Sequence, residues 1–292
     1  MPTLHELVAA ELAQPADPRV VQTAAAVAAL YPNAAQAVLF YGSCLRSSSL
    51  DGAMLDFYLI VSSYRAAYGK SWLATANRLV PPNVFPFEHK GLAAKYAVLS
   101  EDDFAQECGS RARSVSVWAR FAQPSRLVWA RHEAAGGRAI ASIAEAVPTL
   151  LALTLPLFDA GEADIRAIWT RGFSLTYGAE LRAEQGDRSP SIVESEPDRY
   201  RRFGEAALAH VVSLPKAAAE RTWRQLRRRG KLLSVVRLAK ASATFAGGID
   251  YLAWKISRHS GQTVVIHPWH RRFPLFAALI LLPKLLARGA VR

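Results

Sequence analysis

VLFYGSCLRSSSLDGAMLDFYLIV, residues 38–61, predicts a strand, a loop and a second strand. The first strand is an apolar run that stops at Gly42 and Ser43, two residues typical of a turn. The second strand, residues 57–61, is entered through Asp56. The sequence therefore places a carboxylate where a strand meets a loop. Taken alone, the same pattern also fits an ordinary hairpin with a glycine turn.

This strand, loop and strand pattern resembles the polymerase-β-like nucleotidyltransferases. In that superfamily a Gly-Ser pair after the first sheet strand lets backbone amides and a hydroxyl approach a triphosphate. Carboxylates on the next strand hold Mg²⁺ against the triphosphate. The resemblance implies these roles for Gly42, Ser43 and Asp56. The superfamily usually has a second carboxylate two residues later, where this chain has Tyr58.

A closer resemblance is to one branch of the superfamily, the mitochondrial-type phosphatidate cytidylyltransferases, also called translocator assembly and maintenance proteins. Their motifs are Y-G-S-G and M-[LI]-D-F, and this chain has YGSC at residues 41–44 and MLDF at residues 54–57. That branch also lacks the second strand carboxylate. The resemblance implies that Tyr41 belongs to the nucleotide-binding loop together with the glycine and serine that follow it.

Further short matches to this family continue in the same order as far as residue 248. They are KYAV at residues 95–98, ARF and QP within residues 119–124, Tyr177 with ELR at 180–182, LPK at 214–216, VR at 236–237 and TFAG at 244–247. Each match is short, but six matches in the right order are hard to obtain by chance.

The resemblance implies roles for residues that lie far apart in the sequence. Arg120 is expected to contact phosphate, because a guanidinium can bind two phosphate oxygens at once, and Glu180 is expected to complete the metal site. The alternative for both is an ordinary solvated charge. The expected sets are Asp56, Glu180 and Arg120 for catalysis, Asp56 and Glu180 for the metal, Tyr41, Gly42 and Ser43 for the nucleotide, and Arg182, Lys216 and Arg237 for lipid or phosphate.

Three positions depart from the family pattern. Cys44 replaces the second glycine of the loop, which is expected to tighten the phosphate-binding turn. The family's Trp-His pair appears as Trp72 and Leu73, so an imidazole is missing. The family's Asp is Glu180, a carboxylate on a side chain one methylene longer.

The composition is that of a globular protein of 292 residues, with 51% apolar and 21% charged residues. Two cysteines, Cys44 and Cys108, are too few for a disulfide framework and suit a reducing compartment. The first 30 residues lack the features of a signal peptide, and no run reaches the roughly 20 apolar residues of a transmembrane helix. We therefore expect a cytoplasmic protein, peripheral on the inner face of the cytoplasmic membrane.

The whole chain has a net charge of +12, and its positive charge is concentrated in the second half. Residues 199–240 contain 12 basic and 2 acidic residues, and residues 251–292 contain 7 basic and no acidic ones, with tryptophan and phenylalanine between them. A basic patch attracts any polyanion, including nucleic acid. Basic residues mixed with aromatic ones are typical of a segment that lies on an anionic membrane, so we expect a membrane partner and no nucleic acid.

The remaining pattern predicts an α+β protein in two parts. Breaks at Pro15 and Pro18 divide two N-terminal helices, Ser100 is placed to cap a helix, and Gly136 and Gly137 are expected to form a hinge. Other predicted elements are helices at 64–79, 140–158, 162–183, 198–212 and 219–233, strands at 84–87, 96–99 and 127–129, and a loop at 185–197.

These expectations combine into a polymerase-β-like domain, residues 1–135, a mainly helical and winged-helix-like domain, residues 136–250, and a basic amphipathic tail, residues 251–292. The implied reaction is transfer of CMP from CTP to phosphatidate, with Mg²⁺ as cofactor, giving CDP-diacylglycerol and pyrophosphate. The alternatives are a nucleotidyltransferase with another acceptor and a non-catalytic relative that binds membrane or nucleic acid. The sequence does not determine the nucleotide, the acyl chains or the oligomeric state.

Overall fold

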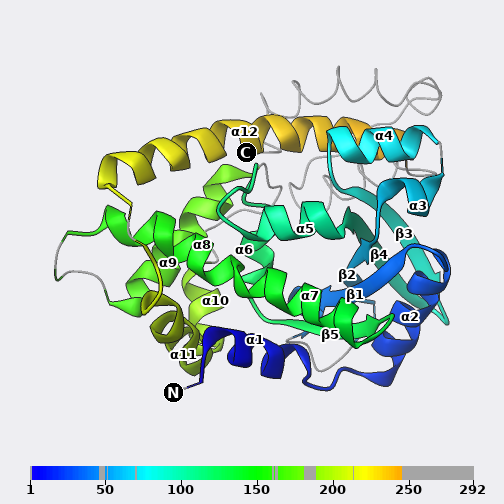
Figure 1. Cartoon of the computed structure of the whole chain (residues 1–292), viewed down its shortest axis with the longest axis horizontal. Coiled ribbons are helices and arrows are strands. Elements are labelled where there is room, and N and C mark those ends of the chain that lie inside the picture. Colours follow the sequence, from blue (N-terminus) through cyan, green and yellow to red (C-terminus); the bar gives the residue numbers. More distant parts are fainter. Residues whose placement is uncertain are drawn as a thin grey trace.

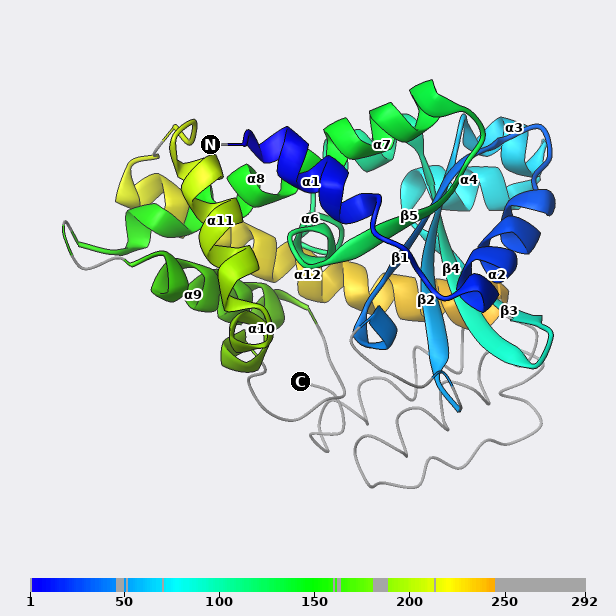
Figure 2. The same cartoon turned by 90° about the horizontal axis from the view of Figure 1, so that it is seen from below.

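The computed structural model describes residues 2–45, 50, 52–69, 71–159, 161, 164–180, 189–212 and 214–244. Within these ranges the prediction of an α+β fold is confirmed, because helices surround one mixed five-stranded sheet. Figures 1 and 2 show the sheet at one end of the molecule and the helices of the second half at the other. Arg182 and the predicted tail, residues 251–292, lie outside the described residues.

The sheet has the strand order β3-β4-β2-β1-β5. Strands β2 and β4 are parallel neighbours, and the other three neighbouring pairs are antiparallel. The predicted strand, loop and strand are therefore present as β1 and β2, paired side by side at the centre of the sheet. The strands are β1 Ala35–Tyr41, β2 Met54–Val61, β3 Asn83–His89, β4 Leu92–Ser100 and β5 Ser125–Ala130.

The central strands are apolar because both faces of the sheet are covered. Successive side chains point to opposite faces, so Phe57 and Leu59 of β2 pack with helix α2, Pro18–Ala29. Tyr58 and Ile60 pack on the other face, beneath α5 Glu101–Cys108 and α7 Glu133–Ala144. Asp56 lies two residues before Tyr58 and so belongs to this second face.

Local signals set the helix boundaries in the first half. Thr3 and Glu6 form a capping box at the start of α1, Leu4–Leu12. Asp17 caps α2, and Ser100 caps α5 by accepting a hydrogen bond from the Asp103 amide, as predicted. The single helix expected at 64–79 is two helices, α3 Tyr64–Tyr68 and α4 Trp72–Leu79.

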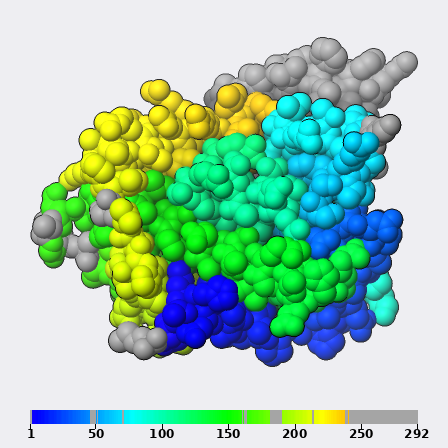
Figure 3. Space-filling model, viewed as in Figure 1, coloured from blue at the N-terminus to red at the C-terminus, as the bar shows by residue number. Residues whose placement is uncertain are grey.

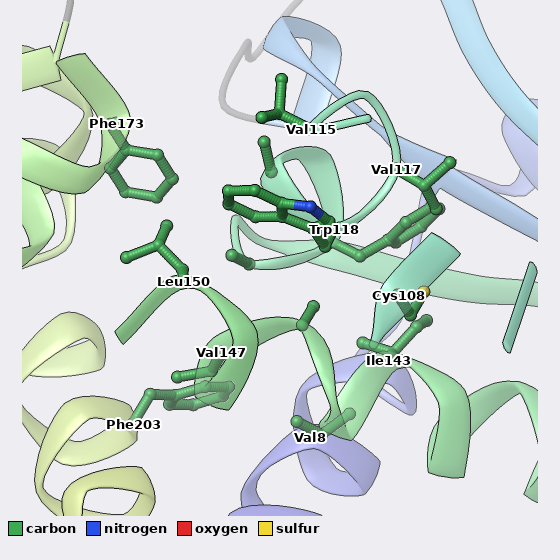
Figure 4. Packing of buried hydrophobic residues seen from close by; sticks show 14 of the residues in the cluster. Val8, Cys108, Val115, Val117, Trp118, Ile143, Val147, Leu150, Phe173 and Phe203 are labelled. Carbon is green, nitrogen blue, oxygen red and sulfur yellow. The ribbon is translucent and has the colours of Figure 1, made fainter. Parts of the chain in front are cut away.

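The second half packs helices around a core centred on Trp118 and Trp169, which are fully buried. Figure 4 shows Trp118 between Val115, Val117 and Leu150. Trp169 also donates a hydrogen bond of 2.8 Å to the Tyr200 carbonyl. The elements are α6 Trp118–Phe121, α8 Ala146–Thr154, η2 Leu155–Leu157, α9 Ile165–Ala179, α10 Ser189–Ser195, α11 Pro197–Leu208 and α12 Lys216–Thr244.

Two of the sequence predictions for this half are wrong. Gly136 and Gly137 lie inside α7 and form no hinge. A Cβ at Gly136 would lie 3.3 Å from a methyl group of Leu127, so the glycine lets the helix pack closely on β5. The loop expected at 185–197 contains α10.

The domain boundary expected after residue 135 falls within α7. One buried cluster joins Val8 of α1 to Phe203 of α11 (Figure 4).

The run Glu133–Leu157 is long enough to cross a membrane, and an 18-residue window within it has a mean hydropathy of 1.7, which is apolar enough for a membrane span. It comprises α7, α8 and η2. Ile143, Val147 and Leu150 of this run are buried in the cluster shown in Figure 4. Packing in the protein core therefore accounts for its apolar composition.

Helix α12 connects the two ends of the molecule. Figure 1 shows it along one edge, from the helical half to the sheet. Its 29 residues correspond to a length of about 44 Å. Trp223 and Leu226 bury one side of the helix in the core. A Cβ at Gly230 would lie 2.2 Å from the carbonyl oxygen of Ala179, so this glycine allows α12 to cross the end of α9 at close range.

Candidate functional site

The site is organised around Asp56, near the start of β2. In the register of the sheet its partners are Tyr41 on β1 and Lys95 on β4. Lys95 Nζ lies 2.9 Å from Asp56 Oδ1, and the two side chains are 30% and 19% exposed. Asp56 is thus a partly buried carboxylate with one oxygen held by a neighbouring cation.

The loop after β1 lies directly against the other oxygen of Asp56. Gly42 has a φ of +95°, and a Cβ at this position would lie 3.2 Å from Asp56 Oδ2. Both the conformation and the close approach therefore favour glycine. The chain continues as a 3₁₀ turn, η1 Ser43–Leu45. Gly42, Ser43 and Asp56, which were predicted to act together, are brought together here.

Cys44 faces away from the loop surface. Its thiol is buried and donates a hydrogen bond of 3.3 Å to the Met54 carbonyl at the start of β2. Burial, reinforced by the charge of Asp56, raises the pKa of the thiol above its usual value. Cys44 therefore anchors the loop to β2 through its side chain, and its protonated thiol is poorly suited to act as a nucleophile.

Tyr41 lies among aromatic rings beside the carboxylate. Its ring centroid is 5.3 Å from that of Tyr58 and 5.9 Å from that of Phe121. Burial, followed by the charge of Asp56, holds the pKa of Tyr41 well above its usual range, while Arg120 acts in the opposite direction. The Tyr41 hydroxyl therefore stays protonated and is available as a donor next to Asp56 and Arg120.

Arg120 links the sheet to the helical half. Its Nη1 donates to the Ser116 carbonyl and lies 3.5 Å from Glu180 Oε1. Burial, the largest single influence, would lower the pKa of Arg120, but the charges of Glu180, Tyr58, Tyr41 and Asp56 together outweigh it, so the pKa is raised. The guanidinium is therefore a permanent cation within the field of both predicted carboxylates.

Glu180 is positioned by the close crossing of α9 and α12. It is the C-terminal cap of α9, in an extended conformation, immediately after the Ala179 carbonyl that meets Gly230. Ser116 Oγ donates a hydrogen bond of 2.5 Å to Glu180 Oε1. This carboxylate therefore makes contacts with both Ser116 and Arg120, which hold it within the protein.

Arg237 and Lys240 reach the same region from α12. Arg237 donates to Ser116 Oγ at 2.5 Å, Ser114 Oγ at 3.5 Å and the Pro81 carbonyl at 2.8 Å. Lys240 Nζ donates to the carbonyls of Val80 and Pro82. Burial lowers the pKa of Arg237, and burial together with repulsion from Arg237 lowers the pKa of Lys240 to about 7.

Lys216 does not lie with the other predicted residues. It begins α12, where its amine contacts Asp159 Oδ1 at 2.8 Å, and both side chains are exposed. Arg237 follows 21 positions later, which corresponds to about 30 Å along a helix. The structure therefore gathers Tyr41, Gly42, Ser43, Asp56, Arg120, Glu180 and Arg237 but leaves Lys216 at the far end of α12.

The donors fit a Mg²⁺ ion that arrives with phosphate ligands. Among the residues that the structure describes, no group of three or more His, Cys, Asp or Glu side chains could form a metal cage. Mg²⁺ is commonly held by one or two carboxylates together with substrate phosphates and water. Asp56, next to the Gly42 loop, matches that requirement. Glu180 could join it only by giving up its contacts with Arg120 and Ser116.

Lys95, Ser116 and Lys240 are site residues that sequence reasoning missed. Lys95 heads the KYAV segment that matched the family pattern, and its distance from Asp56 follows once β2 and β4 are paired in register. Ser116 links Glu180 to Arg237, and no sequence motif marked it. Lys240 lies three residues after Arg237 and therefore on the same side of the helix.

The site combines two carboxylates with three cationic side chains. Asp56 and Glu180 are the carboxylates described above, while Lys95, Arg120 and Arg237 supply positive charge around them. A search of known protein families finds no family model that matches this chain, and no curated protein matches it.

Proposed function

We propose that this chain is a Mg²⁺-dependent nucleotidyltransferase of the polymerase-β-like type that transfers CMP from CTP to phosphatidate. The observation that carries the proposal is the contact between the Gly42 loop and Asp56, which joins a phosphate-binding turn to a strand carboxylate. The antiparallel pairing of β1 with β2, and the convergence of Arg120, Glu180 and Arg237, support the family resemblance seen in the sequence.

In this proposal each part of the site has one task. The Gly42 and Ser43 loop would hold the β and γ phosphates of CTP through backbone amides and a hydroxyl. Asp56 would hold Mg²⁺, which when bound neutralises negative charge on the triphosphate. Arg120 and Arg237 would bind the phosphate of the lipid or the departing pyrophosphate, because guanidinium groups bind phosphate oxygens in pairs.

The reaction needs no covalent enzyme intermediate. An oxygen of the phosphatidate phosphate forms a bond to the α-phosphorus of CTP. The bond from that phosphorus to the bridging oxygen of pyrophosphate breaks, and pyrophosphate leaves with the electron pair. The role of the protein is to align the two anionic substrates and to balance their charge.

Glu180 would act on the substrate through Arg120. Its distance of 3.5 Å from Arg120 Nη1, and its hydrogen bond from Ser116, keep the guanidinium beside the sheet. Metal binding by Glu180, which the family resemblance also implies, would require release of these contacts. We therefore assign Glu180 first as a positioning residue and Asp56 as the main metal ligand.

A lipid substrate requires access to a membrane surface. Helix α12 exposes Arg221, Arg224, Arg228 and Lys231, and Leu232 nearby is 65% exposed. Helix α4 exposes Trp72, the residue that stands in the family's Trp-His position. Figure 3 shows α12 in yellow to orange and the cyan segment that contains α4 along the same edge of the molecule. This basic and apolar edge would bind an anionic membrane peripherally, on the cytoplasmic side.

The residues outside the gathered site would serve the membrane contact. Lys216 lies at the start of α12, where it would meet lipid head groups at the surface rather than the reacting phosphates. Arg182 and the tail, residues 251–292, are proposed to contribute to the same contact. No nucleic-acid partner is proposed.

A panel of acceptors tests the proposal. The purified protein is incubated with labelled CTP and Mg²⁺ and with phosphatidate, diacylglycerol, glycerol 3-phosphate, RNA or a protein mixture. We expect label in the lipid extract with phosphatidate and in no other arm. Label in another arm would retain nucleotidyl transfer and overturn the assigned acceptor. No transfer in any arm, with CTP or with ATP, GTP and UTP, would overturn the proposed enzyme class.

A further inference from the structure

Lys95 lies where it can interact with both the carboxylate and the phosphate-binding loop. On the neighbouring parallel strand it is paired in register with Asp56, and its Nζ lies 2.9 Å from Asp56 Oδ1. Its positive charge also acts on Cys44 of the η1 turn, where it opposes the increase in thiol pKa caused by burial and Asp56. A Cβ at Gly42 would lie 3.2 Å from the other oxygen of the same carboxylate, so the ammonium lies close to the loop at Gly42 as well as to Asp56.

The carboxylate of Asp56 already has a protein cation as its partner. Lys95 holds Oδ1, and Oδ2 faces the loop, where a Cβ added at Gly42 would lie 3.2 Å from it. A cation that approached Asp56 would have to compete with the ammonium of Lys95 for the same negative charge. A displaced lysine would still lie next to the loop that is proposed to bind the triphosphate.

We propose that Lys95 is a phosphate-binding residue that exchanges partners when the metal nucleotide binds. In the free protein its ammonium neutralises Asp56. When a divalent cation and a nucleoside triphosphate bind together, the cation takes the carboxylate and Lys95 turns to a triphosphate oxygen. This inference rests on the proposed function, and it adds a residue and a reason for metal and nucleotide to bind together.

The side-chain chemistry of lysine suits this exchange. An ammonium group is a compact charge with three donors on a flexible stem, so it can bind a carboxylate or a phosphate without a fixed approach direction. The side chain is 30% exposed, which leaves it room to move. The exchange keeps charge balanced in both states, because Asp56 is never left without a cation.

The exchange predicts effects of opposite sign in Lys95→Met, which keeps the aliphatic stem. Mn²⁺, used as a spectroscopic substitute for Mg²⁺, should bind about fivefold more tightly without nucleotide, because its competitor is gone. CTP in the presence of the metal should bind about tenfold more weakly, because one charged hydrogen bond is lost. A purely structural role for Lys95 would weaken both or neither.

Three variants make the measurement specific. Lys95→Arg keeps the charge and should keep most of the affinity for CTP. Asp56→Asn should abolish Mn²⁺ binding, both as a single change and in combination with Lys95→Met. This result would assign the bound metal to Asp56. Lys90→Met removes a lysine from the turn before β4, where it contacts Gln22, and should change neither affinity.

The experiment measures Mn²⁺ by electron paramagnetic resonance and CTP by calorimetry on the full chain, with unfolding curves to confirm that each variant is folded. Opposite shifts in Lys95→Met support the exchange. Unchanged or equally weakened binding of Mn²⁺ and CTP, with wild type binding both, would overturn the role of Lys95 alone. If the wild-type protein binds no nucleoside triphosphate with metal, the proposed function fails, and the exchange fails with it.

Discussion

A Cβ atom at Gly42 would lie 3.2 Å from Oδ2 of Asp56, so a side chain at residue 42 would crowd this carboxylate. Gly42 also has a φ of +95°, which a side chain makes costly. This one relationship joins the phosphate-binding turn to the strand carboxylate.

Gly42→Ala should lower the free energy of unfolding by about 2 kcal/mol, through backbone strain and crowding of Asp56. Gly91→Ala is the matched control, because Gly91 has a φ of +78° but open space around its Cβ position. It should cost about 1 kcal/mol, from strain alone. Urea unfolding of both variants checks this. Equal losses would mean that contact with Asp56 adds nothing.

The pair of Arg120 and Glu180 should be coupled more strongly than its distance suggests. The two side chains are 31% and 10% exposed at 3.5 Å, whereas Arg166 and Glu194 are 65% and 55% exposed at 2.7 Å. Water screens the second pair more effectively.

A double-mutant cycle measures both couplings in unfolding experiments. With Arg120→Gln and Glu180→Gln we expect an interaction of about 1 to 2 kcal/mol, and with Arg166→Gln and Glu194→Gln about 0.5 kcal/mol or less. If the exposed pair couples as strongly as the buried one, Glu180 does not hold Arg120 in place, and the positioning role is wrong.

The lowered pKa of Lys240 predicts that the stability of the protein depends on pH. Burial, with repulsion from Arg237, lowers the pKa of Lys240 to about 7, whereas an unfolded lysine titrates near 10.4. Between these values the unfolded chain holds a proton that the folded chain has released, so rising pH favours the folded state. From pH 7 to 9 the free energy of unfolding of wild type should therefore rise relative to that of Lys240→Met, by at most about 1 kcal/mol per pH unit.

Chemical unfolding at pH 6.5, 7.5 and 8.5 measures this difference. Lys231→Met, on the exposed side of the same helix, is the control and should follow wild type. Parallel curves for wild type and Lys240→Met would show that the amine of Lys240 keeps its ordinary pKa in the folded protein.

The exposed edge of α12 should bind anionic membranes. Each basic residue near such a surface contributes about 1 kcal/mol, and salt weakens this contribution. Changing Arg221, Arg224 and Arg228 to Glu should abolish sedimentation with vesicles that contain anionic lipid at low salt. Reversal of Arg201 and Arg202, which lie on α11, is the control for net charge and should have a small effect. Full sedimentation of the α12 variant would assign the membrane contact to another surface.

Much of the sheet could be predicted because its signals are local. The apolar runs before Gly42 and after Asp56 became β1 and β2, and Ser100 capped α5, since each depends on neighbours in the sequence. The hinge expected at Gly136 was wrong because a contact with Leu127, on another element, requires a small residue there. Such contacts are not visible in a sequence pattern.

The candidate site could likewise be predicted where short sequence motifs marked its residues, but not where the packing of distant elements decides their positions. The order of short motifs led to Asp56, Arg120 and Glu180, which the fold brings close to one another. Lys95 was not identified because its role depends on strand register. Lys216 was grouped with Arg237 because the sequence did not reveal that one unbroken helix separates them.

The most direct test of the central claim follows the position of a label in the product. Wild-type protein is incubated with Mg²⁺, phosphatidate vesicles and CTP labelled with ³²P at either the α or the γ phosphate. We predict label in the lipid extract from α-labelled CTP only, and a loss of several orders of magnitude in Asp56→Asn, which stays folded because the amide has the same shape. Lipid labelled from γ-labelled CTP, or unchanged turnover in Asp56→Asn, would contradict nucleotidyl transfer at this site.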